Sequence, residues 1–270
     1  MTPDWEAFCR ETRVGVQAAL ASLTTRTERE RSHGVGEGGD ETIAVDAVAE
    51  TVVFNRLEEL HEAGHDFVVV SEEAGRMPFG DSASWWLAVD PVDGSKNAKR
   101  QLPYYSLSIA IGDGPTIGDV AYGYVFDLAS EEEWTATRGG GAQLDGEPLG
   151  RETRHDRLES VALEATRPGL LAQLMPRLVD ECDVVRVLGS LALSLCQLAA
   201  VRIDGVAALR PVRSVDIAAG QLIARESGAR VALANSGILA ESPIDLERRS
   251  LVIAANGEDG LRALSEALNG

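Results

Sequence analysis

Two aspartates stand where an apolar segment ends, in the stretch WWLAVDPVDGSKNAKR that runs from Trp85 to Arg100. Asp90 directly follows WWLAV, and Asp93 comes three residues later, before a glycine and a serine. A sequence of the form Asp-Pro-x-Asp-Gly alone favours a surface turn. The apolar segment before it, however, predicts a buried strand, and burial of unpaired charge costs several kcal/mol. A compensating charge is therefore expected beside the two carboxylates.

The ligand types in this stretch suit a hard cation. The two carboxylates and the Val92 carbonyl between them offer only oxygen atoms, which Mg²⁺ prefers together with water and phosphate oxygens. The backbone N–H groups from Gly94 and Ser95 onward can open a helical turn, and such a turn is an anion site. The stretch therefore predicts a cation next to a bound anion.

Further acidic residues occur in similar places. Glu72 and Glu73 close the apolar run DFVVVS, and Asp216 opens the helix-like segment SVDIAAGQLIARESG, whose small residues allow close packing. An aspartate in a first helical turn is by default a capping residue worth less than about 1 kcal/mol. The order Glu-Glu, Asp-Pro-x-Asp-Gly-Ser and Val-Asp-x-Ala-Ala-Gly is much more specific than any of its parts. Trp85 and Trp86 are expected to face opposite sides of their strand.

The elements that must position these residues follow two patterns along the chain. In the first, we expect a long helix over 4–30, a Gly-rich loop over 31–42, a helix over about 46–63, a buried strand over 66–75, three antiparallel strands within 104–142, and a turn at Asp145-Gly146. In the second, strands over 160–165, 183–189, 205–210, 229–234 and 249–255 alternate with helices over 168–181, 190–202, 215–227 and 258–268. The chain is therefore expected to be α/β, with an α+β half over 1–150 that carries most of the acidic residues named above and an α/β half over 151–270 that carries Asp216.

Composition limits the functional classes. The net charge of −18 argues against nucleic acid or an anionic membrane as a partner. No apolar run reaches a membrane-spanning length and no signal peptide is evident, so we expect a cytoplasmic protein. Of 25 lysines and arginines, Lys96 and Lys99 are the only lysines. Such an acidic, lysine-poor chain is typical of salt-loving microbes, and a GC-rich genome is an alternative or additional explanation.

The cysteines and histidines show no ligand spacing. We expect the three cysteines, Cys9, Cys182 and Cys196, to be core residues on helices, and the four histidines, His33, His61, His65 and His155, to lie at the surface.

Taken together, the motifs resemble those of the inositol monophosphatase superfamily of Mg²⁺-dependent phosphatases. The resemblance covers nearly the whole chain, through GGDETIAVDAVAE, VVVSEE, WLAVDPVDGSKNA, VRVLGSLALSLCQLAAVRIDG and VRSVDIAAGQLIARESGA. The forms GDET, DGSKNA and LRPVRSVDIAA are most similar to the archaeal branch, whose members commonly dephosphorylate both inositol monophosphates and fructose 1,6-bisphosphate. The resemblance implies a layered α-β-α-β-α sandwich of the sugar phosphatase type and a homodimer.

The resemblance also implies metal ligands. Glu72, Asp90 and the Val92 carbonyl would hold one Mg²⁺, and Asp90, Asp93 and Asp216 would hold a second. A third, looser ion could share Glu72, and Mn²⁺ could replace Mg²⁺. The ions would polarise the phosphate and activate a water for in-line attack at phosphorus.

Other residues match catalytic and substrate-side positions of the family. Ser95 replaces the more common threonine and keeps a hydroxyl that can orient the water and hydrogen-bond Asp46. The implied substrate-binding residues are Asp93, Gly94, Ser95, Arg186, Gly189, Ser190, Leu191, Arg210 and Asp216. Two departures leave substrate choice open: Ala208 stands where many relatives have an acid, and the segment 209–216 is about one residue shorter, which leaves the places of Arg210 and Arg213 open.

The predicted function is phosphomonoester hydrolysis, with fructose 1,6-bisphosphate as the first candidate substrate, which would place the protein in carbohydrate metabolism and gluconeogenesis. Inositol monophosphates are the second candidate. The alternatives are a nucleotidase acting on 3′-phosphoadenosine phosphates and a catalytically silent, metal-binding regulator. We place Lys96 and Lys99 near the phosphate entrance.

Overall fold

Two sheets form the framework of the computed structural model, which describes residues 2–234, 237–248 and 251–269. Within these residues, the larger sheet has eight strands in the order β10-β9-β8-β7-β6-β5-β3-β4, and the smaller has five in the order β12-β11-β13-β15-β14. The larger sheet consists of β3 (Phe67–Ser71), β4 (Gly75–Phe79), β5 (Trp85–Asp93), β6 (Ser106–Gly112), β7 (Val120–Asp127), β8 (Glu133–Thr137), β9 (Gly141–Leu144) and β10 (Glu147–Pro148). The smaller sheet consists of β11 (Leu158–Glu164), β12 (Cys182–Arg186), β13 (Gly205–Ala208), β14 (Arg230–Leu233) and β15 (Val252–Ala255).

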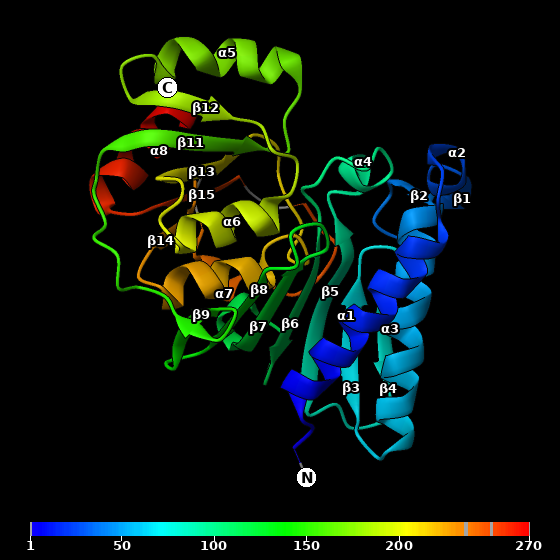
Figure 1. Cartoon of the computed structure of the whole chain (residues 1–270). Helices are drawn as coiled ribbons and strands as arrows, with labels where there is room; N and C mark the ends of the chain where they lie inside the picture. Colours follow the sequence, from blue (N-terminus) through cyan, green and yellow to red (C-terminus); the bar gives the residue numbers. More distant parts are fainter. Residues whose placement is uncertain (1, 235–236, 249–250, 270) are drawn as a thin grey trace.

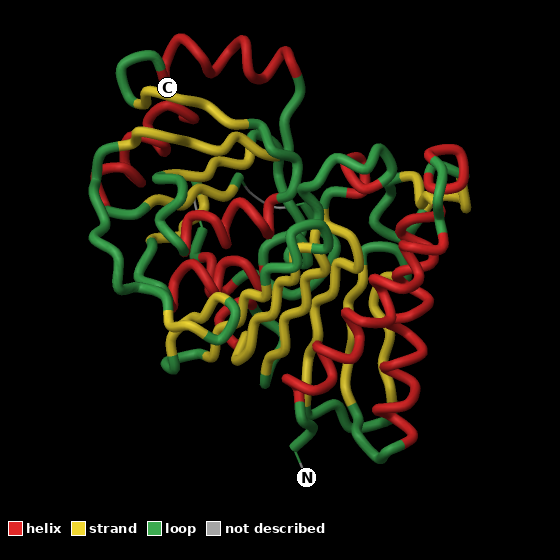
Figure 2. The backbone as a smooth tube through the Cα atoms, in the orientation of Figure 1, coloured by secondary structure: helices red, strands yellow, loops and turns green. Residues whose placement is uncertain are grey.

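Helices separate and cover the sheets (Figure 1). The helices are α1 (Trp5–Ser22), α2 (Arg26–Arg29), α3 (Ala44–Glu62), α4 (Ser95–Ala98), α5 (Pro168–Leu178), α6 (Leu191–Ala199), α7 (Ala218–Glu226) and α8 (Glu258–Asn269). Helices α1 and α3 pack on one face of the larger sheet, α7 and α6 lie between the two sheets, and α5 and α8 lie beyond the smaller sheet. Figure 2 shows this alternation of helix and strand layers. The predicted α-β-α-β-α sandwich is confirmed.

Three apolar cores fill the spaces between the layers. One joins α1 and α3 to the larger sheet, a second surrounds α6 and α7, and a third lies under α5 and α8. Strand β5 contributes to two of them, because alternate residues of a strand point to opposite faces. Trp85 packs against the first core and Trp86 against the second, as expected.

The pairing of β3 with β5 positions the acidic residues. The two strands are parallel, and Ser71 pairs with Val89. The next residues, Glu72 and Asp90, therefore leave the sheet side by side at its carboxyl edge. Strand β5 pairs with β6 in an irregular register between Asp90 and Asp93, where the chain turns toward α4.

Several elements differ from those predicted. The predicted helix over 4–30 is interrupted, because Leu23 is extended and Thr25 begins α2 with a capping box to Glu28. The predicted Gly-rich loop contains a hairpin of β1 (Ser32–Val35) and β2 (Glu41–Ile43), and β4 was not predicted. The first two residues of the strand predicted over 249–255 lie outside the described residues.

The cysteines were predicted correctly in two cases of three. Cys9 and Cys196 are buried on α1 and α6, whereas Cys182 is half-buried and begins strand β12, so its assignment to a helix was wrong. Cys182 pairs with Leu158 at the start of the parallel pairing of β11 with β12, which places it in the sheet. Among the described residues, no helix combines the length and apolar character needed to cross a membrane.

Candidate metal and phosphate site

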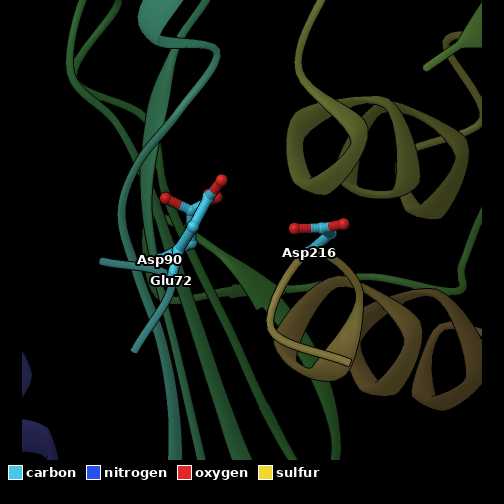
Figure 3. A group of neighbouring side chains, drawn as sticks. All are labelled: Glu72, Asp90 and Asp216. Atoms are coloured by element: carbon cyan, nitrogen blue, oxygen red, sulfur yellow. The ribbon is translucent and has the colours of Figure 1, made fainter. Parts of the chain in front are cut away.

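Three carboxylates from distant parts of the chain meet at the edge of the larger sheet. Glu72 follows β3, Asp90 lies in β5, and Asp216 lies just before α7; each offers one oxygen, and these oxygens all lie within 4.8 Å of one another. Figure 3 shows Glu72 and Asp90 together on one side with Asp216 facing them. Three of the predicted metal ligands thus meet, whereas Asp93 and the Val92 carbonyl are not part of this group. Three carboxylate oxygens at this spacing suit a hard cation.

The electrostatics of this cluster call for positive charge. Burial raises the pKa of Asp90 well above its ordinary value, and the neighbouring carboxylates of Glu72, Asp93 and Asp216 raise it further. Burial, followed by the charge of Glu72, raises the pKa of Asp216 to about 7. Closely spaced carboxylates in a desolvated site favour protonation unless a cation neutralises them.

Asp93 connects β5 with α6. Its Oδ2 accepts hydrogen bonds from the Ser190 hydroxyl at 2.6 Å and from the Ala192 N–H at 2.7 Å. These bonds partly offset the burial that raises the pKa of Asp93 to about 7. The contact ties the carboxyl end of β5 to the start of α6, which carries the predicted substrate-side residues.

Ser95 and Asp46 lie on the other side of the turn. The Ser95 hydroxyl donates to the Val92 carbonyl at 2.9 Å. Asp46 is in the first turn of α3 and accepts from the Ile43 N–H at 3.2 Å, and the nearby Ser95 side chain acts to lower its pKa. Burial nevertheless raises the pKa of Asp46 to about 6. Asp46 thus makes a capping contact, and the hydroxyl of the neighbouring Ser95 donates to Val92 rather than to Asp46.

The turn after Asp93 depends on glycine. Gly94 has φ +96°, and a Cβ there would meet the Gly189 carbonyl at 3.0 Å and the Tyr104 carbonyl at 3.1 Å. A side chain would therefore be strained by the backbone and blocked by its neighbours. Gly94 brings the start of α4 against the loop before α6.

The remaining substrate-side residues do not all share one environment. Ser190 and Leu191 are buried at the start of α6. Gly189 is exposed, with φ +95°. Arg186 is exposed at the end of β12, and the Arg210 Nε donates to the Ala165 carbonyl at 2.9 Å. The contact of Arg210 is therefore with the main chain after β11, a structural tie that the sequence did not predict.

Glu164 is a residue that the sequence reasoning did not single out. It is 2 % exposed and accepts from the Gly189 N–H and the Ser194 hydroxyl, both at 2.8 Å, and from the Leu188 N–H at 3.3 Å. In the parallel pairing of β11 with β13 it lies opposite Ala208. The available signal was its place at the end of an apolar strand, as with Glu72. Glu164 therefore holds the loop of residues 188–189, after which the Ser190 hydroxyl hydrogen-bonds Asp93.

Arg213 is the second missed residue. It is 3 % exposed, and its guanidinium pairs with both Glu72 and Asp40. Its main-chain N–H donates to Asp216 Oδ2 at 2.8 Å. The sequence left its place open because the segment before Asp216 is short. The spacing Arg-x-x-Asp was the signal, since it places the N–H of one residue in reach of the carboxylate three residues later.

Known proteins are similar to this chain over two thirds of its length or more. A model of the inositol monophosphatase family matches residues 7–269. A fructose-1,6-bisphosphatase/inositol-1-monophosphatase of Archaeoglobus fulgidus is 32% identical over 250 residues, which are 92% of this chain and 91% of the relative. The Nus factor SuhB of Pasteurella multocida is 36% identical over 188 residues, 67% of this chain and 68% of the relative.

The fold has a similar solved counterpart. A hypothetical protein from Pyrococcus horikoshii, with similarities for inositol-1 monophosphatase, superposes with a TM-score of 0.81 at 26% identity and covers 98% of both chains. Sequence, fold and the meeting of the three acidic motifs agree, and the chain belongs to the inositol monophosphatase family.

Proposed function

We propose that the protein is a metal-dependent phosphomonoesterase that hydrolyses fructose 1,6-bisphosphate and inositol monophosphates with water. The observation that carries this proposal is the meeting of Glu72, Asp90 and Asp216, whose oxygens lie within 4.8 Å of one another at the end of a buried strand. The family is metal-dependent, and carboxylates clustered in a desolvated site are costly to bury unless cations compensate them.

The donor set favours Mg²⁺. Glu72, Asp90 and the Val92 carbonyl would hold one ion, Asp90, Asp93 and Asp216 a second, and a third, looser ion would share Glu72. Mn²⁺ fits the same oxygen ligands. When bound, the metal lowers the pKa of a water and offsets the charge that develops on the phosphoryl oxygens.

Around the metal ligands, the chain's own groups orient the reactants. Gly94 and Ser95 would hold the phosphate through their N–H groups, and the Ser95 hydroxyl would orient the attacking water. Asp46 lies near Ser95 and would accept a hydrogen bond from its hydroxyl once that hydroxyl turns from Val92 toward the water. Lys96 and Lys99 on and beside α4 would attract the anionic substrate to the site.

The rest of the substrate would lie on the α6 side. Here Gly189, Ser190 and Leu191 would line the sugar or inositol ring, and Arg186 and Arg210 would stand further out. Fructose 1,6-bisphosphate is the first candidate, because the Archaeoglobus relative carries that activity in its name. Inositol monophosphate is the second on the same ground.

Several biological features belong to this proposal. The enzyme would act as a homodimer in the cytoplasm and serve gluconeogenesis, and its net charge of −18 favours a halophilic source. The halves 1–150 and 151–270 would act as two lobes, the first with most metal ligands and the second with Asp216 and the substrate-side residues.

A second candidate is a metal-binding regulator without catalysis. The observation that favours it is that one relative, at 36% identity, is named a Nus factor rather than a phosphatase. Against it stands the presence of every acidic residue and of the Ser95 hydroxyl that the chemistry needs.

The test is a substrate panel in molar KCl with MgCl₂. Phosphate release would be measured from fructose 1,6-bisphosphate, inositol 1-phosphate and 3′-phosphoadenosine 5′-phosphate, with and without EDTA. The proposal predicts metal-dependent turnover of the first two. Turnover of the nucleotide alone would identify a nucleotidase, and silence on all three, with Mg²⁺ binding retained, would support the regulator.

A further inference from the structure

The loop between β1 and β2, residues 36–40, lies directly on the metal-binding acids. The Glu37 N–H donates to the Glu73 carbonyl and the Gly38 N–H to the Glu72 carbonyl, both at 2.9 Å. A Cβ at Gly38 would meet the Glu72 carbonyl at 2.9 Å and the Arg213 Cζ at 3.1 Å. The loop therefore packs against both residues closely enough to require glycine.

Arg213 joins this loop to the cluster. Its Nη2 donates to the Gly38 carbonyl at 2.8 Å and pairs with Asp40, while its Nη1 pairs with Glu72. One guanidinium thus bridges the loop and a carboxylate of the acidic cluster. Among the residues that the structure describes, its buried Nε has no hydrogen-bond partner, and its two Nη atoms bond to two separate elements rather than to one carboxylate.

The position of Arg213 goes beyond a need to neutralise Asp40. Asp40 has a 60% exposed side chain, and Arg248, itself 42% exposed, already pairs with it. Arg213 is instead buried and anchored by its own N–H to Asp216. Its desolvated guanidinium, paired with Glu72, therefore places one positive charge at the edge of the acidic cluster.

We propose that Arg213 is a positioning residue that acts as a resident cation, holding loop 36–40 closed on Glu72 without the help of a metal ion. This inference rests on the proposed function only in assigning Glu72 to the metal centre. Because the guanidinium belongs to the chain itself, it can hold the loop against Glu72 whether or not an ion is bound. Loop closure in this protein is then independent of Mg²⁺.

Hydrogen exchange at the Glu37 and Gly38 amides measures this closure directly. In the wild type, the two amides should be protected in EDTA, and Mg²⁺ should change their exchange rates by less than twofold. In Arg213→Met, which keeps the buried stem, exchange in EDTA should be at least tenfold faster, and Mg²⁺ should slow it again by pairing with the freed Glu72.

Two further variants separate the bridge from general folding. Asp40→Asn removes the charged one of the two loop groups that Arg213 contacts and leaves the bond to the Gly38 carbonyl, so exchange at the same amides should be faster than in the wild type but slower than in Arg213→Met. Arg248→Met removes the other cation on Asp40 without touching Glu72, and exchange should stay within twofold of the wild type.

The proposal is overturned by wild-type amides that are protected only with Mg²⁺, or by Arg213→Met amides that stay protected in EDTA while the variant remains folded by circular dichroism. Because these rates require no turnover, they separate the two proposals. If the protein showed no phosphatase activity but the protection of the Glu37 and Gly38 amides still depended on Arg213, only the proposed function would be overturned.

Discussion

The Ser190 hydroxyl and Asp93 form the contact on which the substrate side of the site depends. Ser190 is buried, and its hydroxyl lies 2.6 Å from Asp93 Oδ2. A hydrogen bond to a charged group contributes about 1.5–3 kcal/mol. Asp93 is held toward α6 by this bond and by the Ala192 N–H.

Ser190→Ala should therefore lower kcat/KM for fructose 1,6-bisphosphate by roughly tenfold, because Asp93 loses a donor that fixes its orientation. Steady-state kinetics at saturating Mg²⁺ would measure it. Ser22→Ala, on the exposed side of α1, is the matched control and should change nothing. A kcat/KM of Ser190→Ala equal to that of the wild type would contradict this prediction.

Glu164 makes stability depend on pH. Burial raises its pKa to about 7, so the native state binds a proton that the unfolded state has released at its ordinary pKa. For an acid with a raised native pKa, the contribution to stability is highest at low pH and falls as pH rises through both values. The wild type therefore loses stability from Glu164 between about pH 4 and pH 7.

Glu164→Gln should remove this dependence. Relative to the wild type, the free energy of unfolding of the variant should rise by up to about 3 kcal/mol between pH 5 and pH 8. Urea denaturation at both pH values, in EDTA, would measure the difference. A constant offset between the two proteins across this range would contradict the assignment.

At the scale of elements, the sequence predicted those helices and strands that follow from the spacing of apolar residues and from the residues that end each apolar run. The strand-end positions of Glu72 and Asp90 followed from the apolar runs before them, and the parallel register then places them side by side. The hairpin over the acidic site and the role of Arg213 could not be predicted in this way. They depend on contacts between residues about 140 positions apart in the chain, such as Arg213 with Glu72, which no local pattern encodes.

The close packing of α7 against the larger sheet can be tested by adding side-chain volume at the contact. A Cβ at Gly123 in β7 would meet the Ala219 carbonyl at 3.0 Å, and one at Gly220 would meet Leu195 Cδ1 at 3.0 Å. Helix α7 is therefore held closely between β7 and α6, and this places Asp216 opposite Glu72 and Asp90.

Gly123→Val should destabilise the protein by about 1–3 kcal/mol, since overpacking must push α7 away from the sheet. It should also weaken Mg²⁺ binding, because Asp216 moves with α7. Gly169→Ala in α5 is the control: no neighbouring atom lies within 4 Å of the added Cβ, and helix propensity favours alanine. Equal melting temperatures for Gly123→Val and the wild type would contradict this account.

At the scale of the whole molecule, charge sets the working conditions. A net charge of −18 on one chain repels itself, and the Debye length is about 10 Å at 0.1 M salt. The total charge could be calculated from the sequence. The pairing of Asp40 with Arg213 and Arg248 could not be predicted, because these residues meet only in the folded chain.

Raising KCl from about 0.1 M to about 2 M should therefore increase the melting temperature by several degrees through screening. Differential scanning calorimetry at constant pH would follow the change, with the same titration at about pH 4.6 as the control, where the sequence charge is near zero. A melting temperature that falls with KCl at neutral pH would show that self-repulsion does not limit stability.

The central claim is that Glu72, Asp90, Asp93 and Asp216 form a metal centre for phosphate hydrolysis. Its most direct test is phosphate release from fructose 1,6-bisphosphate by the wild type and Asp93→Asn, titrated with MgCl₂ in molar KCl. The account predicts activity that requires Mg²⁺ in the wild type and at least a hundredfold loss, on the order expected for a lost metal ligand, in the variant. An unchanged rate in Asp93→Asn, or full activity in EDTA, would contradict it.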